Sequence, residues 1–342
     1  MNILNPKKTV DLECVYTLTP KKLVENIYFE KFFDKKDIIK STSLTGIKSR
    51  FWCEDNETTV DLCSAAAKAL IEEKGVDIND IDALILVTQT PDYQIPASSY
   101  VCHKNLNLKE DCLAFDVNLG CSGYIYGYFL ATSLINSGCK KVLLLAGETS
   151  SKTIDLNDPG TSMLFGDAGT ASLFSESIKE NKEQKFTFKS SGSGFNNIII
   201  PSGISRNSFK DEHKDVESGK LYMNGPAVFN FTITKVPNLI KDFSKNLDCN
   251  ISDWDFILLH QANQFIINHI YKKIKIEDRA AFSNIHKFGN TSSASIPLLI
   301  SDLGKKINTD SKVLGAGFGV GLSWAATNLT FSDNFSSSHI HR

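Results

Sequence analysis

Phe-Asp-Val-Asn-Leu-Gly-Cys-Ser-Gly, residues 115–123, connects two apolar runs of different length. The first run, 113–117, has the length of a buried strand, and the second, 124–134, has the length of a helix. The small residues between them permit a sharp turn, so we expect Cys121 at a strand-to-helix corner. Unpaired amides and the helix dipole favour a thiolate there, and a thiolate can hold an acyl group as a thioester. Read alone, Cys121 is more commonly interpreted as a small buried hydrophobe.

Two later segments carry further candidate site residues. The apolar run 256–259 ends in His260, and the loop 286–297 places Asn290 before a series of small residues. A cysteine with a distant histidine and asparagine is a recognised nucleophile arrangement. Taken separately, His260 is more commonly a core histidine with satisfied hydrogen bonds, and Asn290 is as often a residue that caps a loop.

The three segments, in this order, resemble the active-site motifs of the ketoacyl-acyl-carrier-protein synthase III family within the thiolase superfamily. The resemblance runs over nearly the whole chain, because it extends to 45–50, 164–169, 223–225 and 315–324. It implies an α/β protein with a thiolase-like fold, in which two duplicated α/β halves form a five-layered arrangement.

A faint internal repeat agrees with a duplicated fold. Residues 77–87 and 250–260 each place an acidic turn before an apolar run of strand length. We therefore expect an N-terminal half over 1–175, which carries the nucleophile, and a C-terminal half over 176–331, which carries the histidine and asparagine. The Ser- and His-rich segment 332–342 is predicted to be a disordered tail.

The resemblance implies a role for each of Cys121, His260 and Asn290. Cys121 would accept an acyl group from a thioester, and a neutral His260 would assist that step. His260 and Asn290 would then donate hydrogen bonds to the thioester carbonyl of a malonyl group. Loss of CO₂ drives negative charge onto that oxygen, so donors aimed at it stabilise the transition state more than the ground state. The resulting carbanion would attack the acyl group on Cys121.

Further residues would support this chemistry. The resemblance implies that the backbone amides of Cys121 and Val320 hold the second oxyanion, and that glycines such as Gly319 bring their loop close to the thiol. Asn263 would orient the histidine loop. Ile95 would lie at the tip of a loop that crosses a dimer axis and closes the partner's acyl pocket, so we expect a homodimer.

Three functions remain open from the sequence. A Cys-His-Asn set resembles initiating synthases of fatty-acid biosynthesis and their polyketide-type relatives, and therefore favours a decarboxylating condensing enzyme. An acyltransferase could instead pass the acyl group from Cys121 to an alcohol or amine. A non-catalytic partner subunit is the third candidate, although such a partner usually loses the nucleophile that this chain retains.

The sequence departs from the family where coenzyme A and the carrier protein would bind. The tryptophan and arginine that precede the Thr-Gly-Ile motif are missing from 37–44, and Pro159 stands in place of another arginine. The family's basic residue after the His-Gln-Ala-Asn motif, which is linked to carrier-protein docking, is replaced by Gln264-Phe265. Because the missing side chains would stack on adenine, contact phosphate or dock the carrier, we expect a donor other than simple acetyl-CoA. The small Ile95 favours acyl groups longer than acetyl.

The composition narrows the possible partners and compartments. The net charge of −2 gives no general attraction for nucleic acid, and no apolar run approaches the roughly 20 residues that cross a membrane. The eight cysteines form no CxxC pair and no metal-like cluster, as expected for a cytoplasmic enzyme. The implied substrates are acyl-CoA or acyl-carrier-protein thioesters, with acyl carrier protein as partner and no metal or redox cofactor.

Overall fold

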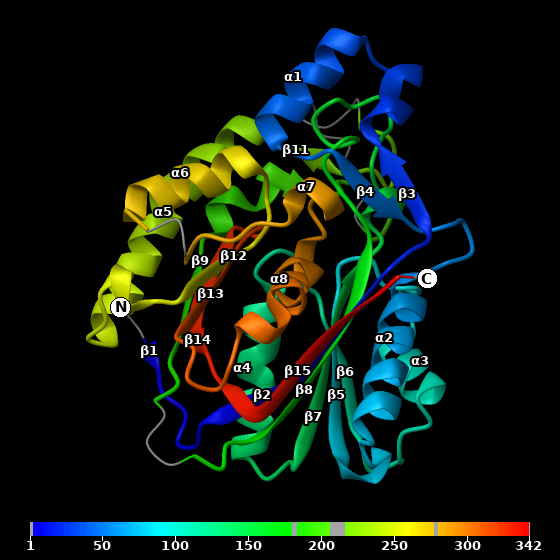
Figure 1. Ribbon diagram of the computed structural model, residues 1–342. Coiled ribbons are helices and arrows are strands. Elements are labelled where there is room, and N and C mark those ends of the chain that lie inside the picture. Colours follow the sequence, from blue (N-terminus) through cyan, green and yellow to red (C-terminus); the bar gives the residue numbers. More distant parts are fainter. Residues whose placement is uncertain (1–2, 180–182, 206–215, 277–279, 342) are drawn as a thin grey trace.

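The protein consists of two mixed β-sheets with helices between them and on both outer faces (Figure 1). The computed structural model describes residues 3–179, 183–205, 216–276 and 280–341. The helices include α1 (Lys35–Thr45), α2 (Thr59–Lys74), α3 (Ser98–Asn105), α4 (Gly123–Asn136), α5 (Gly225–Asn246), α6 (Gln264–Ile274), α7 (Ile285–Phe288) and α8 (Ser295–Leu303). Within the described ranges, no helix is long and apolar enough to cross a membrane.

The first sheet has the strand order β15-β2-β8-β7-β5-β6. Its strands are β2 (Val10–Thr19), β5 (Ile81–Val87), β6 (Leu113–Val117), β7 (Lys141–Glu148), β8 (Ala168–Glu176) and β15 (Phe331–His341). Strand β5 runs parallel to both β6 and β7, whereas β8 is antiparallel to β7 and β2. Central strands such as β5 and β7 are apolar along their length because both faces of the sheet are covered.

The second sheet has the order β1-β9-β14-β13-β12. Its strands are β1 (Ile3–Leu4), β9 (Phe186–Ser190), β12 (Phe256–Leu259), β13 (Val313–Gly319) and β14 (Ser323–Leu329). Two short pairs lie outside both sheets and join β3 (Lys22–Glu25) to β4 (Ser49–Trp52) and β10 (Ile198–Ile199) to β11 (Tyr222–Met223).

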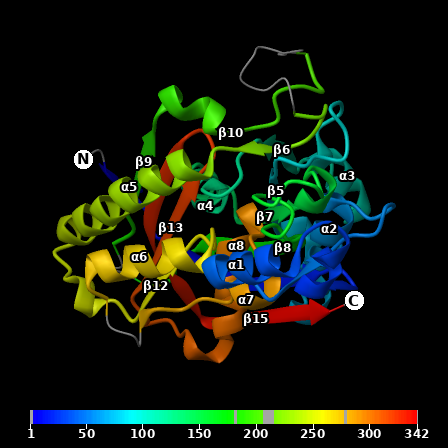
Figure 2. The ribbon, with the colours of Figure 1, turned by 90° about the horizontal axis from the view of Figure 1, so that it is seen from above.

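The helices complete a layered arrangement. Helices α4 and α8 lie between the sheets, and one continuous apolar core joins them to both inner faces. Figure 2 shows α5 and α6 beside the second sheet and α2 and α3 on the opposite side of the molecule. Each outer pair encloses its own core against the sheet that it covers. The layers are therefore helices, sheet, helices, sheet and helices, which confirms the predicted fold class.

The internal repeat corresponds to two similar local structures. A single 3-10 turn, Ile78–Asp80, precedes β5, and another, Ile251–Asp253, precedes β12. An aspartate side chain holds each turn: Asp77 accepts the amide of Asn79 at 2.9 Å in the first, and Asp253 accepts the amide of Asn250 at 2.7 Å in the second. Each turn therefore leads directly into a buried strand, β5 in the first sheet and β12 in the second.

The C-terminal tail is a strand, so the prediction of disorder for 332–342 was wrong over the described residues. Residues 336–341 of β15 run parallel to β2 opposite 14–19. The hydroxyl of Thr19 lies 3.3 Å from the His339 ring and 3.1 Å from the His341 ring, and these two imidazoles stack on each other. The low hydrophobicity of the segment concealed this pairing, because its stability comes from backbone hydrogen bonds to β2.

The first and last strands of the chain do not follow the division into two halves. Strand β8 ends at Glu176 and β9 begins in the other sheet, close to the boundary predicted at residue 175. However, β1 pairs with β9 and β15 pairs with β2, so each terminus joins the sheet formed mainly by the opposite half. The division into halves at this residue stays a prediction.

Removal of residues 332–342 should destabilise the protein. The truncation exposes the edge of β2, whose Cys14, Tyr16 and Leu18 side chains are now buried. We expect a loss of about 3 kcal/mol in the free energy of unfolding, the sum of several backbone hydrogen bonds at about 0.5–1.5 kcal/mol each. Thermal unfolding measures this loss, with a chain lacking only Arg342 as the control. An unchanged midpoint in the long truncation would contradict the role of β15.

Candidate active site

Cys121 lies at the predicted corner between β6 and α4. The corner is tight, since the amide of Gly123 donates to the carbonyl of Gly120 at 2.6 Å. The hydroxyl of Ser122 lies 2.6 Å from that of Ser323 and thereby joins the corner to the start of β14. The strand and helix expected on either side of the cysteine are both confirmed.

A glycine-rich turn from the second sheet lies directly against the cysteine. Strand β13 ends at Gly319, and the chain passes Val320 before it re-enters the sheet as β14. A Cβ on Gly319 would lie 2.7 Å from Cys121 Cβ and 2.8 Å from its Sγ, and a Cβ on Gly317 would lie 2.7 Å from Ser122 Cα. Only glycine permits this approach, which places the Val320 amide within hydrogen-bonding reach of the sulfur.

Replacement of Gly319 by alanine should therefore disable the thiol without unfolding the protein. The new methyl group must displace either the Cys121 side chain or the turn that carries Val320. A displacement of about 1 Å at a reacting group can cost about 100-fold in rate, so we expect a loss of that size in the acylation rate. Gly192→Ala is the matched control, because a Cβ there meets no atom within 4 Å. Acylation of Gly319→Ala at the normal rate would contradict this geometry.

The charge state of Cys121 differs from the one expected from its position. Burial raises the pKa of the thiol to about 11, although the amides of Val320 and Cys121 and the hydroxyl of Ser292 all hydrogen-bond the sulfur and lower it. The nearby Glu148 carboxylate raises the pKa further. The effect of desolvation on the pKa outweighs these three hydrogen bonds, so the resting side chain is a thiol and not the expected thiolate. A base must accept its proton during attack.

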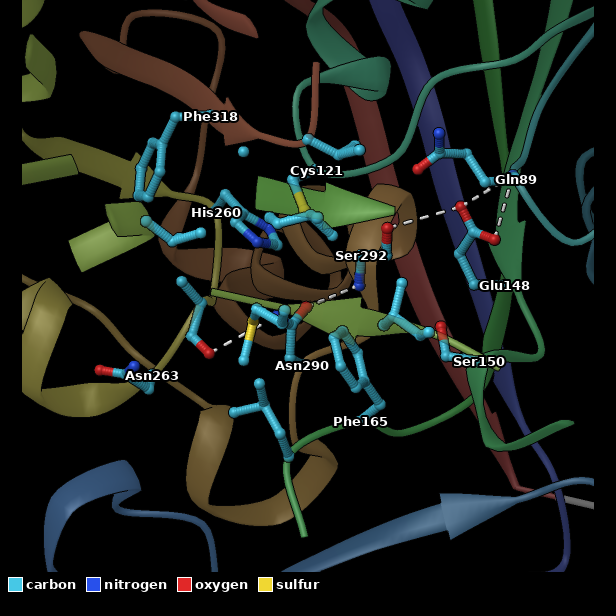
Figure 3. A pocket seen from close by; sticks show the side chains of 18 of the residues that line it. Gln89, Cys121, Glu148, Ser150, Phe165, His260, Asn263, Asn290, Ser292 and Phe318 are labelled. Carbon is cyan, nitrogen blue, oxygen red and sulfur yellow. Dashed lines mark hydrogen bonds between the residues drawn. The ribbon is translucent and has the colours of Figure 1, made fainter. Parts of the chain in front are cut away.

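His260 follows β12 and is almost completely buried. Its Nδ1 lies 2.7 Å from the hydroxyl of Ser295, the first residue of α8, which fixes the orientation of the ring. Burial lowers the pKa of the imidazole to about 3, so the ring is neutral at physiological pH, as the sequence interpretation requires. Figure 3 shows the ring beside Cys121 within one cavity.

Asn290 is held by the backbone on both sides. Its backbone amide donates to the carbonyl of Leu164 at 2.9 Å, and its backbone carbonyl accepts from the amide of Gly166 at 3.0 Å. The side-chain Oδ1 accepts the amide of Ser292 at 2.9 Å, so the side-chain NH₂ is the group left to serve as a donor. Its other contact is a marginal one of 3.5 Å to the carbonyl of Ala262.

One cavity of about 380 Å³ brings the predicted residues together. Cys121, His260, Asn290, Asn263, Gly319 and Val320 all line it. Its wall is largely apolar and includes Leu164, Phe165, Ile198, Ile199, Ile200, Leu221, Met223, Val228, Phe229, Ile266 and Phe318. This composition suits an apolar group whose carbonyl reaches the thiol.

The supporting residues lie in different places. Asn263 caps α6 by accepting the amide of Ile266 at 2.8 Å, and this bond fixes the loop after His260. Ile95 is 85% exposed and does not line the cavity of its own chain. Its assignment to the partner's pocket stays a prediction.

The polar residues of the site that were missed from the sequence include Glu148, Ser292 and Ser295. Glu148 ends the apolar run of β7, and a carboxylate at the end of a buried strand was the available signal. The two serines belong to the small-residue series after Asn290, where nothing distinguishes them from their neighbours. Within the described part of the chain, no cluster of metal-ligating side chains is found.

The layered sheets and the cysteine corner define a thiolase-fold enzyme, and comparisons with known proteins agree. Models of 3-oxoacyl-[acyl-carrier-protein] synthase III and of its C-terminal region match residues 115–193 and 245–331. A beta-ketoacyl-[acyl-carrier-protein] synthase III of Staphylococcus epidermidis is 36% identical over 91% of this chain and 95% of its own.

Solved structures give the same result. A 3-oxoacyl-(acyl-carrier protein) synthase from Burkholderia xenovorans superposes with a TM-score of 0.95 at 36% identity, covering 100% of this chain and 99% of its own. The priming beta-ketosynthase of the R1128 polyketide pathway gives 0.85 at 25% identity, covering 97% and 98%. The chain belongs to the 3-oxoacyl-[acyl-carrier-protein] synthase III family and is an acyl-transferring condensing enzyme.

Proposed function

We propose that the protein transfers an acyl group from a thioester to Cys121 and then condenses it with a malonyl thioester to give a 3-ketoacyl thioester. The observation that carries this proposal is the convergence of Cys121, His260 and Asn290 on one cavity from separate elements. The malonyl group would be carried by acyl carrier protein, as the names of the relatives suggest. The proposed chemistry requires no metal or redox cofactor.

In the acylation step, the sulfur attacks the donor carbonyl and the donor thiol leaves. The amides of Cys121 and Val320, which now bond the sulfur, would hold the oxyanion that forms beside it. Because these donors are backbone groups, valine serves at position 320 as well as any other residue whose backbone fits the turn.

In the condensation step, the malonyl carbonyl would lie between His260 and Asn290. Nε2 donates to that oxygen in the tautomer in which the Ser295 hydroxyl turns from the carbonyl of Ser292, its acceptor at 2.8 Å, to Nδ1. The NH₂ group of Asn290 is the second donor, since its Oδ1 is engaged by the backbone. CO₂ leaves, the enolate carbon attacks the acyl group on Cys121, and the 3-ketoacyl thioester is released.

The donor in this proposal is an acyl-carrier-protein thioester or a longer acyl-CoA rather than acetyl-CoA. The positions that would stack on adenine carry Leu44, which is half exposed, and Pro159. Phe265 takes the place of a basic residue and stacks on Phe229, which lines the cavity, at a ring distance of 5.4 Å. None of these three side chains offers the positive charge that contacts to phosphate would require.

The proposed assembly is a homodimer in the cytoplasm. The exposed Ile95 and its neighbour Tyr93, which is 57% exposed, would be covered by a second copy of the chain. All eight cysteines are free thiols, which suits a reducing compartment.

The test is a donor panel with malonyl-carrier protein, in which CO₂ release and 3-ketoacyl product are both measured. We expect product from acyl-carrier-protein or longer acyl-CoA donors, with one CO₂ per product. A micromolar KM for acetyl-CoA would overturn the proposed donor. Acyl transfer to an alcohol or amine without CO₂ release would show that the protein is an acyltransferase of another kind.

A further inference from the structure

Glu148 is a buried carboxyl group in the reactive cavity that the chemistry above does not use. It is 1% exposed, and its oxygens accept the amide of Gln89 at 3.1 Å and the hydroxyl of Thr90 at 2.8 Å. Within the part of the chain that the structure describes, no cation forms an ion pair with it. Burial without a counter-charge raises the pKa of this carboxyl to about 7, so it exchanges a proton readily at neutral pH.

Ser292 connects this carboxyl to the nucleophile. Its hydroxyl lies 3.5 Å from Glu148 Oε1, a long contact that Figure 3 marks with a dashed line, and it also hydrogen-bonds the sulfur of Cys121. The contacts around it are close, because a Cβ on Gly120 would lie 2.8 Å from Ser292 Oγ. The hydroxyl therefore lies between the group that must lose a proton and a group able to accept one.

The backbone at Ser292 is arranged to hold the hydroxyl there. The residue has a φ of +49°, in the left-handed region that favours glycine. Its amide is fixed by the Oδ1 of Asn290 at 2.9 Å. A non-glycine residue kept in this conformation inside a cavity indicates a side chain retained for a purpose.

We propose that Glu148 is the proton acceptor for the Cys121 thiol, reached through the hydroxyl of Ser292. As the sulfur forms its bond to the donor carbonyl carbon, the S–H proton passes to Ser292 Oγ, and the hydroxyl proton passes to Glu148. When the tetrahedral intermediate collapses, the C–S bond to the donor breaks and its electron pair leaves on the donor sulfur. The proton held by Glu148 returns through Ser292 to that thiolate, so the carboxylate is restored and the donor leaves as a neutral thiol.

His260 is a poorer acceptor for this proton. Burial lowers the pKa of its imidazole to about 3, and its Nδ1 is already engaged by Ser295. General base catalysis is most effective when the pKa of the base lies near the working pH. If Glu148 takes the thiol proton, His260 stays neutral and can donate a hydrogen bond in the condensation step.

The inference rests on the proposed function, and single-turnover acylation followed by intact mass tests it. Glu148→Gln keeps the shape of the side chain and cannot take the proton, so we expect acylation at pH 7 to slow by about 100-fold. Ser292→Gly suits the left-handed backbone and should cause a similar loss, with the double variant no worse than either single one. Decarboxylation of malonyl-carrier protein by enzyme that has already been acylated should change less than about 2-fold, because it depends on other donors.

The pH profile separates a proton acceptor from a merely structural residue. The other titratable groups that face this path are Cys121, His260 and Cys63, and none of them has a pKa near 7. Wild-type acylation should therefore rise through an inflection near pH 7 as Glu148 loses its proton, and Glu148→Gln should lack that inflection.

Asp92→Asn is the matched control, since Asp92 is a partly buried carboxylate with a raised pKa that does not line the cavity. We expect it to acylate at the wild-type rate. Wild-type acylation by Glu148→Gln or by Ser292→Gly would overturn the inference, as would equal losses in acylation and decarboxylation. Failure of the wild-type enzyme to form any acyl adduct would instead overturn the proposed function.

Discussion

Replacement of Cys121 by alanine should abolish the acyl-enzyme and the 3-ketoacyl product. The side chain is the proposed nucleophile at the corner of β6 and α4, and within the described residues of the cavity no second cysteine is present. Loss of a covalent nucleophile costs on the order of 10⁴ to 10⁶-fold, which places the variant near the background rate. Product formation with the donor panel and intact mass both measure this effect.

The same variant should retain a partial reaction. His260 and Asn290 do not depend on the thiol for their positions, because Ser295 holds the ring and the backbone of Ser292 holds the amide. We therefore expect slow CO₂ release from malonyl-carrier protein without product. Retained ketoacyl formation by Cys121→Ala would refute every covalent mechanism for this protein.

Replacement of His260 by alanine should have the second largest effect, and on the other half-reaction. The neutral imidazole is proposed to donate to the oxygen that gains charge as CO₂ leaves, and removal of such a donor costs about 100 to 1,000-fold. Acylation of Cys121 should fall far less, because the sulfur is bonded by the amides of Val320 and Cys121. Separate measurement of the acylation rate and the CO₂ release rate checks this division.

Asn290→Asp is an informative companion to that variant. It keeps the oxygen that accepts the Ser292 amide but replaces the donating NH₂ group with an acceptor. We expect it to lose decarboxylation to a similar extent as His260→Ala while its melting temperature changes little. Equal loss of acylation and decarboxylation in both variants would mean that the two residues only support the cavity.

The sequence was sufficient to predict the fold and to name residues that converge on one cavity. The change from a strand-length to a helix-length apolar run located the corner at Cys121, and the structure places β6 and α4 on either side of it. The glycines near Val320 predicted a close approach, and the 2.8 Å between a Gly319 Cβ and the sulfur confirms it. These features are local, so they can be read from the order of residues along the chain.

Features that depend on surroundings could not be predicted in this way. The thiol of Cys121 is protonated because of burial, which the helix position alone does not reveal. The strand β15 is stabilised by its partner β2 and carries little hydrophobic signal of its own. The contact between Glu148 and Ser292 joins residues 144 apart in the chain, and no spacing rule brings the two together.

The most direct test of the account is intact-protein mass spectrometry of the enzyme mixed first with acyl thioesters and then with malonyl-carrier protein. We expect a mass increase of one acyl group that is absent in Cys121→Ala. This adduct should disappear only when malonyl-carrier protein is added, with release of CO₂. An adduct that persists after malonyl addition, or one that forms equally on Cys121→Ala, would contradict the central claim.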